Sequence, residues 1–268
     1  MTPFWMAAFR SAIAAAVLFC VFIPTGKLVK PTRADLPVMA SITLLHMVGF
    51  SVLAAIGLYL VPVGRSVVLA YSTPLWVMPG AALFLGERFT ARRAGGVALG
   101  LLGLCVLFNP FAFQWDDRNA VLGHGAILLA ALLWAGSILH IRGHAWRATP
   151  LQLLPWESLG ATVFLFGIAF LSSPWPTIEW NARLVLLLVS TSVLGSTIPY
   201  WAIATAGRRL SAGTVSLGLL GTPVVGVLSA MVALGEVPEA AVWIALALII
   251  GGVAFGTTGF KRVLPRAP

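Results

Sequence analysis

Nine runs of apolar residues, each about 20 residues long, restrict what this chain can fold into. At a rise of about 1.5 Å per residue, a helix of this length crosses the roughly 30 Å hydrocarbon core of a bilayer. Backbone groups find no water in hydrocarbon, so the runs are expected to be helices. They cover about residues 4–24, 35–60, 63–86, 91–109, 120–142, 150–172, 182–206, 211–235 and 239–260.

The composition agrees with a lipid solvent, because 59% of the residues are hydrophobic and only 9% are charged. A soluble domain carries about 25% charged residues. The net charge of +9 does not indicate nucleic acid, since the basic residues lie in short clusters between apolar runs. Cys20 and Cys105 sit inside apolar runs, and no metal site or cofactor is expected.

The basic residues also predict an orientation. If the loop 25–34 is cytoplasmic, thirteen of the seventeen Lys and Arg residues lie on that side and three on the other. The remaining one, Arg10, lies within the first span. Cytoplasmic loops carry an excess of Lys and Arg. We therefore expect nine spans in the plasma (inner) membrane with the C-terminus in the cytoplasm.

Two blocks repeat at a fixed distance. "STPLWVMPGAALFLGE" at 72–87 and "GTPVVGVLSAMVALGE" at 221–236 lie 149 residues apart. The same shift places the last three spans on the second, third and fourth, and Thr149-Pro150 falls near Thr2-Pro3. The span at 120–142 has no earlier counterpart. We expect a first repeat of four helices at 1–110, without its opening helix, and a second of five at 119–262. A five-helix unit is odd-numbered, so the copies should be inverted in the membrane.

Together with "ALLWAGSILHIR" and "AFRSAIAAAVLF", the paired blocks resemble the EamA branch of the drug/metabolite transporter superfamily. The resemblance implies an exporter of small metabolites, with ten helices in two inverted halves around a central cavity. This chain departs from that pattern by lacking the first helix. Either the start codon is placed too late, or a nine-helix form exists.

Titratable side chains at membrane depth are functional candidates. Arg10 and Glu157 each lie about 10 Å below a surface, and inversion is expected to place them near opposite faces. Their depths would differ by about 10 Å, too far for an ion pair. The guanidinium of Arg10 is suited to binding a substrate carboxylate, and the carboxyl group of Glu157 is suited to binding a cation or carrying a proton. The alternative for both residues is that the side chain snorkels to the membrane interface. His46 lies near mid-span, as a packing residue or as a substrate or proton contact.

The predicted substrate-binding set adds four deep aromatic residues to these three. A buried Trp or Tyr needs a partner for its polar atom and so tends to face polar space, although lipid-facing packing is an alternative. The complete set is Arg10, His46, Tyr71, Trp134, Trp156, Glu157 and Tyr200.

Five further residues are predicted to have structural roles. Pro74, Pro199 and Pro223 are expected inside helices, where each removes a hydrogen bond and kinks the chain. Glu87 and Glu236 follow glycines at span ends, which is typical of helix termination. The small-residue steps Gly96–Gly100 and Gly252–Gly256 should allow close helix packing within one chain, rather than between two.

The leading hypothesis is a secondary exporter of a small amino-acid-like or amphiphilic compound, working by alternating access. A non-transporting partner subunit or a truncated remnant is an alternative. The hypothesis of a membrane-embedded enzyme is less favoured, because the sequence has no Gly-rich phosphate loop, no His/Cys metal cluster and no paired carboxylates on one helix. Proton coupling and oligomeric state stay open.

Overall fold

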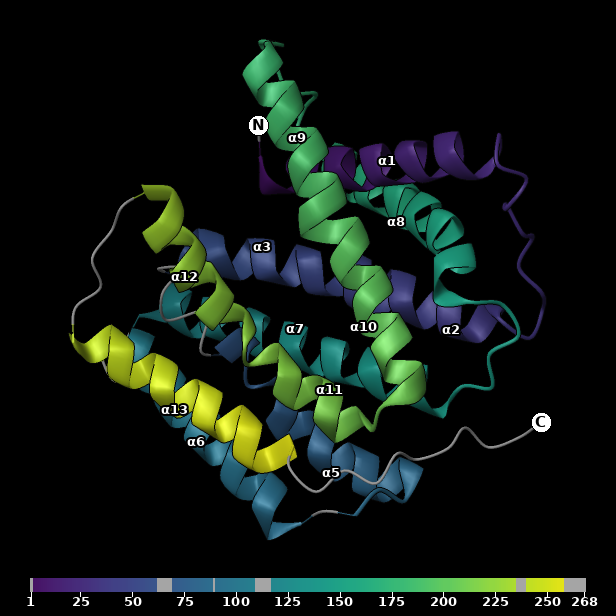
Figure 1. The fold of residues 1–268 in the computed structure, drawn as a ribbon. Helices are drawn as coiled ribbons and strands as arrows, with labels where there is room; N and C mark the ends of the chain where they lie inside the picture. The colour runs from purple at the N-terminus through teal and green to yellow at the C-terminus, as the bar shows by residue number, and fades with distance from the viewer. Residues whose placement is uncertain (1, 62–68, 89, 109–116, 235–239, 258–268) are drawn as a thin grey trace.

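The computed structural model describes residues 2–61, 69–88, 90–108, 117–234 and 240–257, and these residues are almost entirely helical (Figure 1). No strand occurs among them. The chain runs through α1 (Pro3–Phe22), α2 (Leu36–Ser41), the π-helical η1 (Ile42–Phe50), α3 (Ser51–Leu60), α5 (Thr73–Leu85), α6 (Ala91–Phe108), α7 (Arg118–Gly143), α8 (Pro150–Ser172), α9 (Ala182–Ser192), the π-helical η3 (Val193–Thr197), α10 (Ile198–Arg209), α11 (Ala212–Leu219), α12 (Thr222–Leu234) and α13 (Ala240–Thr257).

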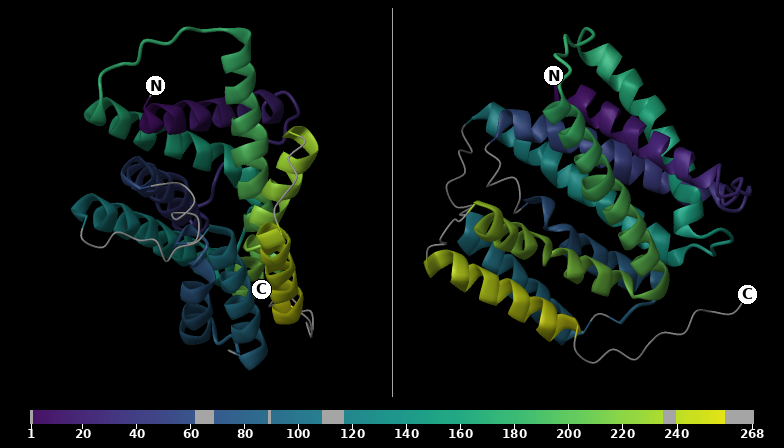
Figure 2. Two further views of the ribbon diagram at one scale, coloured as in Figure 1. Left: turned by 90° about the vertical axis from the view of Figure 1, so that its left-hand side faces the viewer. Right: turned by 45° about the horizontal axis from the view of Figure 1, so that its top comes forward.

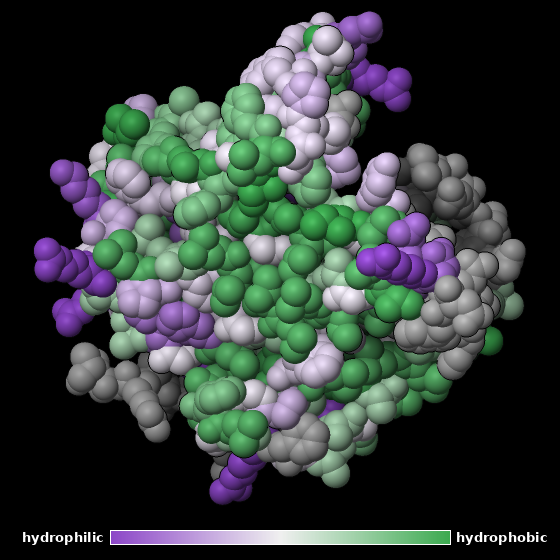
Figure 3. All heavy atoms as spheres, turned by 180° about the vertical axis from the view of Figure 1, so that it is seen from behind, coloured by the Kyte–Doolittle hydropathy of each residue, from purple (hydrophilic) through white to green (hydrophobic). Residues whose placement is uncertain are grey.

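The helices have the length and surface that a bilayer requires. Within the described residues, seven helical spans are long and apolar enough to cross a membrane, and α5 is a shorter apolar helix. Large apolar side chains such as Leu171 and Phe84 point outward. One face of the molecule is a broad apolar surface with hydrophilic residues towards its edges (Figure 3). The predicted all-helical membrane fold is confirmed.

Helices in the two parts of the chain match one another in their bounds. Both ends of α5 and α12 differ by 149 residues, and so do both ends of α6 and α13. The π-helical segment η3 also falls within η1 under this shift. Helices α1 and α8 begin at Pro3 and Pro150, which are 147 residues apart. The repetition seen in the sequence is therefore a repetition of structure.

The matched helices α6 and α13 pack against each other through small residues (Figure 2). A Cβ atom built on Gly96 would lie 2.6 Å from the carbonyl oxygen of Gly252, and one on Gly103 would lie 2.8 Å from that of Ala245. The partner number falls as the number along α6 rises, so the helices are antiparallel. The small-residue steps are used within one chain, as predicted.

Helices α1 and α8 are also antiparallel neighbours (Figure 2). The indole of Trp5 donates to the carbonyl of Pro174 at 3.1 Å, near the start of α1 and the end of α8. Farther along, Ser11 Oγ donates to the carbonyl of Ser158 at 3.1 Å. Ser11 and Ser158 are equivalent positions, 147 residues apart, so each copy meets the other at the same point.

The structure corrects the expected proline kinks. Pro74 and Pro223 lie in the first turns of α5 and α12, not in helix interiors. The first turn of a helix needs no N–H there, so proline fits without breaking a hydrogen bond. The predicted span 211–235 is two helices, separated at Leu220–Gly221. Pro199 does lie within a continuous span, directly after η3.

Several of the basic loops meet at one end of the molecule. The Asp35 carboxylate accepts the backbone N–H of Arg147 at 3.0 Å. Arg142 donates to the carbonyl of Arg208 at 3.4 Å. These residues belong to segments that the charge distribution placed on a single side, and below we refer to this end as the basic end.

The contact between α6 and α13 predicts a strong difference between neighbouring glycines. Gly252→Ala should destabilise the protein by about 1–3 kcal/mol, because the new methyl group meets the α6 backbone at 2.6 Å. Thermal unfolding in detergent should show a lower midpoint. Gly251→Ala is the matched control, since a Cβ there has no neighbour within 4 Å. Equal midpoints for the two variants would contradict the packing described.

Candidate functional site

An aromatic cluster lies in the interior where three segments meet. The ring of His46, from η1, stacks on Trp134 of α7 at 5.2 Å and meets the edge of Tyr200 of α10 at 4.7 Å. Phe50 lies 5.0 Å from Trp134. His46 and Trp134 are both buried. Three residues of the predicted binding set are therefore brought together.

Two of these side chains lie in or near the π-helical segments. His46 lies within η1, and Tyr200 follows shortly after η3. A π segment widens the helix and is frequent at functional sites. The side chain of Tyr200 also lies close to that of Ser51. Since Ser51 and Tyr200 are 149 residues apart, they are equivalent positions that meet each other.

Tyr71 joins the edge of the cluster from the break that precedes α5. Its ring centre lies 6.5 Å from that of Trp134. Its side chain lies close to that of Thr222, the first residue of α12. The two Thr-Pro helix starts are thus linked through Tyr71, beside the aromatic cluster.

Arg10 and Glu157 lie at the same level, which corrects the expected difference in depth. Each directly precedes one partner of the Ser11–Ser158 hydrogen bond. Arg10 donates to Ser196 Oγ. No ion pair joins Arg10 to Glu157. The expectation failed because residue counts from the span ends ignore how far one helix is displaced along the other.

Among the described residues, several buried polar side-chain atoms have no hydrogen-bond partner, and some of them belong to helices that form the cluster. These include Trp134 Nε1 and Ser137 Oγ on one side of α7, with Glu157 Oε1, Arg10 Nε and Thr205 Oγ1. Glu157 is only 2% exposed. Buried polar groups are nearly always hydrogen-bonded, so each of these atoms needs an explanation. A bound ligand would supply the missing partners.

One residue of the predicted binding set, Trp156, lies elsewhere. Trp156 donates its indole N–H to the carbonyl of Val29, in the segment between α1 and α2, and its ring meets Phe19. Neither contact reaches the aromatic cluster. Glu87 follows Gly86, whose φ of 63° ends α5 as expected, and Glu236 lies outside the described residues.

The sequence interpretation missed Phe50 and Thr205. Phe50 is four residues after His46, a spacing that places both on one helix face, and this signal was available. Thr205 gave no signal, because a single hydroxyl in an apolar span has many packing roles.

Comparison with known proteins identifies the family. A model described as the EamA-like transporter family matches residues 1–109 and 121–258. The chain belongs to this family. The uncharacterized transporter YoaV of Bacillus subtilis is 22% identical to it, over 97% of this chain and 89% of the relative. The aromatic amino acid exporter YddG of Ancylobacter novellus is 27% identical, also over 97% of this chain and 89% of the relative.

A crystal structure with 22% identity shows the same fold, at a TM-score of 0.81 over 96% of this chain and 89% of that chain. Membership of the EamA-like transporter family makes the chain a multi-pass membrane transporter and not an enzyme. Among the described residues, no three His, Cys, Asp or Glu side chains gather as metal ligands would.

A second polar centre in this EamA-like transporter holds two loops together at the basic end. Asp35 is fully buried and accepts hydrogen bonds from the N–H groups of Arg147 and Ala148. Burial raises the pKa of its carboxyl, but these donors, the Thr32 hydroxyl and the charge of His144 together hold it below its ordinary value. The sequence interpretation did not single out Asp35.

Asp35→Asn should lower the free energy of unfolding by about 1.5–3 kcal/mol, because the backbone donors lose a charged acceptor. The carboxylate's contribution is complete above the ordinary carboxyl pKa of about 3.9. It is lost as the pH falls through the lower folded value. Thermal unfolding measured against pH should therefore show the two proteins converging below about pH 4.

The control is Asp117→Asn, since Asp117 is an exposed carboxylate that accepts only from its own helix, at Asn119 N. Asparagine is also a good N-cap, so the change should be small at every pH. A pH-independent gap for Asp35→Asn, or an equal gap for Asp117→Asn, would contradict the role given to Asp35.

Proposed function

We propose that this chain is a secondary exporter of small organic metabolites that works by alternating access between two inverted helical units. The first unit covers residues 1–110 and the second 119–262. The helix bounds that recur at 149 residues, and the antiparallel contacts of α6 with α13 and α1 with α8, support this division. Transporters built from inverted repeats bind their substrate near the bilayer midplane, where the repeats meet.

The proposed location is the inner membrane, with the basic end and the C-terminus in the cytoplasm. The distribution of Lys and Arg supports this orientation.

The observation that carries the proposal is the aromatic cluster with its partnerless polar atoms. His46 comes from the first unit, and Trp134 and Tyr200 come from the second, so the cluster spans the junction. A ligand bound there touches both units, so its contacts change when the units move relative to each other. The Nε1 of Trp134 and the Oγ of Ser137 are donors with no hydrogen-bond partner among the residues that the structure describes.

The chemistry of the cluster favours an amphiphilic, amino-acid-like substrate. Aromatic faces such as Trp134 and Tyr200 bind apolar or aromatic groups by stacking. Arg10 would hold a carboxylate through its guanidinium, and Glu157 would hold an ammonium group. The name of the YddG relative, an aromatic amino acid exporter, agrees with this chemistry.

Transport assays with purified protein in liposomes test the proposal. Efflux of labelled phenylalanine or tryptophan should exceed that from protein-free liposomes. Trp134→Ala should reduce it about tenfold, because stacking on an aromatic residue and the area it buries together exceed 1.4 kcal/mol. Trp243→Ala is the control, since Trp243 is 49% exposed on α13 and contacts no part of the cluster.

Absence of efflux for amino acids and for amphiphilic cations would count against the exporter and favour a non-transporting subunit. If Trp134→Ala has the same efflux as the wild type, the exporter proposal stands but the aromatic cluster is not the substrate site.

Glu157 is proposed to couple export to proton entry. A carboxylate without a partner is strongly unfavourable in a low-dielectric interior, so the group should exchange between a bound proton and a bound substrate cation. Glu157→Gln should therefore abolish transport driven by a pH gradient while exchange of labelled for unlabelled substrate continues. Glu179→Gln, in an exposed loop, is the control. Gradient-driven transport by Glu157→Gln would disprove this coupling role.

A further inference from the structure

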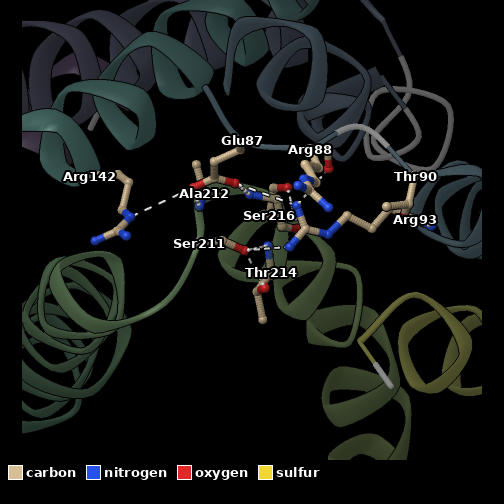
Figure 4. A network of polar contacts seen from close by, with 10 residues as sticks. Glu87, Arg88, Thr90, Arg93, Arg142, Ser211, Ala212, Thr214 and Ser216 are labelled. Carbon is tan, nitrogen blue, oxygen red and sulfur yellow. Dashed lines mark hydrogen bonds and ion pairs between the residues drawn. The ribbon is translucent and has the colours of Figure 1, made fainter. Parts of the chain in front are cut away.

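Glu87 makes contacts far beyond the helix end that it follows (Figure 4). Its Oε1 accepts the backbone N–H of Ala212 at 2.9 Å, and its Oε2 accepts that of Gly213 at 3.5 Å. Both donors belong to the first turn of α11. The amino end of a helix carries a partial positive charge, which favours a carboxylate at this position.

Two arginines complete the setting of this carboxylate (Figure 4). Arg93 of α6 lies 3.6 Å from Oε2, and Arg142 of α7 lies 3.7 Å from Oε1. Arg93 also donates to Ser211 Oγ at 3.1 Å. One carboxylate thus connects the segment between α5 and α6 with α7 and α11.

Glu87 is not needed to cap α11. Ser211 already does so, since its Oγ accepts the N–H of Thr214 at 3.3 Å. The additional carboxylate comes from a residue 125 positions earlier in the chain. Its contribution is therefore to hold two parts of the molecule together, and in the proposed division these are the first and the second unit.

The charges at this site are neither fully buried nor freely exposed. The side chains of Glu87, Arg93 and Arg142 are 14%, 19% and 21% exposed. A small hollow lined by Met78, Ala81, Arg88 and Gly213 lies beside the carboxylate. Water would hydrate all three charges if the helices separated, so the interaction can break and re-form without leaving a charge in hydrocarbon.

We propose that Glu87 is a latch that keeps the transport pathway closed at the basic end in the conformation observed. The inference rests on the proposed function, because alternating access requires each end to open and close in turn. When the basic end opens, α11 and α7 move away from Glu87, and its hydrogen bonds and ion pairs are replaced by water. The latch sets the balance between the two conformations and does not contact substrate.

Access from each side to a single cysteine measures this balance. The reporter is Ser137→Cys in a protein that also carries Cys20→Ser and Cys105→Ser. Ser137 is fully buried, one turn from Trp134 towards the basic end. A membrane-impermeant thiol reagent is applied from each side, using vesicles of defined orientation.

Glu87→Gln should raise the labelling rate from the basic side about tenfold and lower the rate from the other side. The amide still accepts an N–H but loses both ion pairs, and loss of charge-assisted contacts shifts a two-state equilibrium by this order. Arg142→Gln should shift the labelling rates in the same direction. It replaces Glu87→Gln as the test if that variant does not fold. Asp117→Asn, a carboxylate that caps only its own helix, should change neither rate.

A purely structural role predicts a different result: a lower unfolding temperature with unchanged rates, or faster labelling from both sides. Either outcome overturns the latch. If the wild type transports a substrate but the labelling rates are unchanged in both Glu87→Gln and Arg142→Gln, the latch is overturned and the proposed exporter function stands. A one-sided change in labelling without transport of any tested compound supports the latch and counts against the proposed exporter.

Discussion

Hydrocarbon provides no hydrogen-bond partners, so this chain must satisfy its buried polar groups internally. It does so even where its helices are interrupted. Before α5, Ser72 Oγ donates to the carbonyl of Leu69 at 2.6 Å, and Thr73 Oγ1 donates to that of Ala70 at 2.9 Å. In η3, Thr197 Oγ1 donates to the carbonyl of Ser192 at 3.0 Å. Some buried atoms among the described residues nevertheless lack such a partner, and Trp134 Nε1 and Glu157 Oε1 are the two on which the proposed site chiefly rests.

The recurrence at 147–149 residues places chosen side chains opposite their own counterparts. Ser11 meets Ser158, and Ser51 lies close to Tyr200, which agrees with the proposed two inverted copies. The chemistry where the copies meet is nevertheless unequal. Ser51 faces a tyrosine, and the position equivalent to His46 is Gly195. An asymmetric site within a symmetric frame suits a small, asymmetric substrate.

The sequence predicted the helical fold and selected His46, Trp134 and Tyr200 as candidates among seven residues, because apolar length and polarity within a span are local signals; that these three meet is a finding of the structure. It placed Pro74 inside a helix, which was wrong, because the Thr-Pro pair suits the first turn of a helix equally well. The level of Arg10 relative to Glu157 depends on how far α1 is displaced along α8. Counting residues from the span ends gives no information about this displacement. The partners of Glu87 lie more than a hundred residues away along the chain. Local patterns therefore predicted only the helix end at Gly86.

The inverted arrangement of the two units is the claim on which the transport account depends. In that arrangement the segment after α1 and the segment after α8 are equivalent and must face opposite sides of the membrane. Single cysteines at Lys27 and Glu179, both exposed, can be labelled with a membrane-impermeant maleimide in a background of Cys20→Ser and Cys105→Ser. We predict that Lys27→Cys reacts only in inside-out vesicles and Glu179→Cys only in right-side-out vesicles. Reaction of both from the same side would contradict the account.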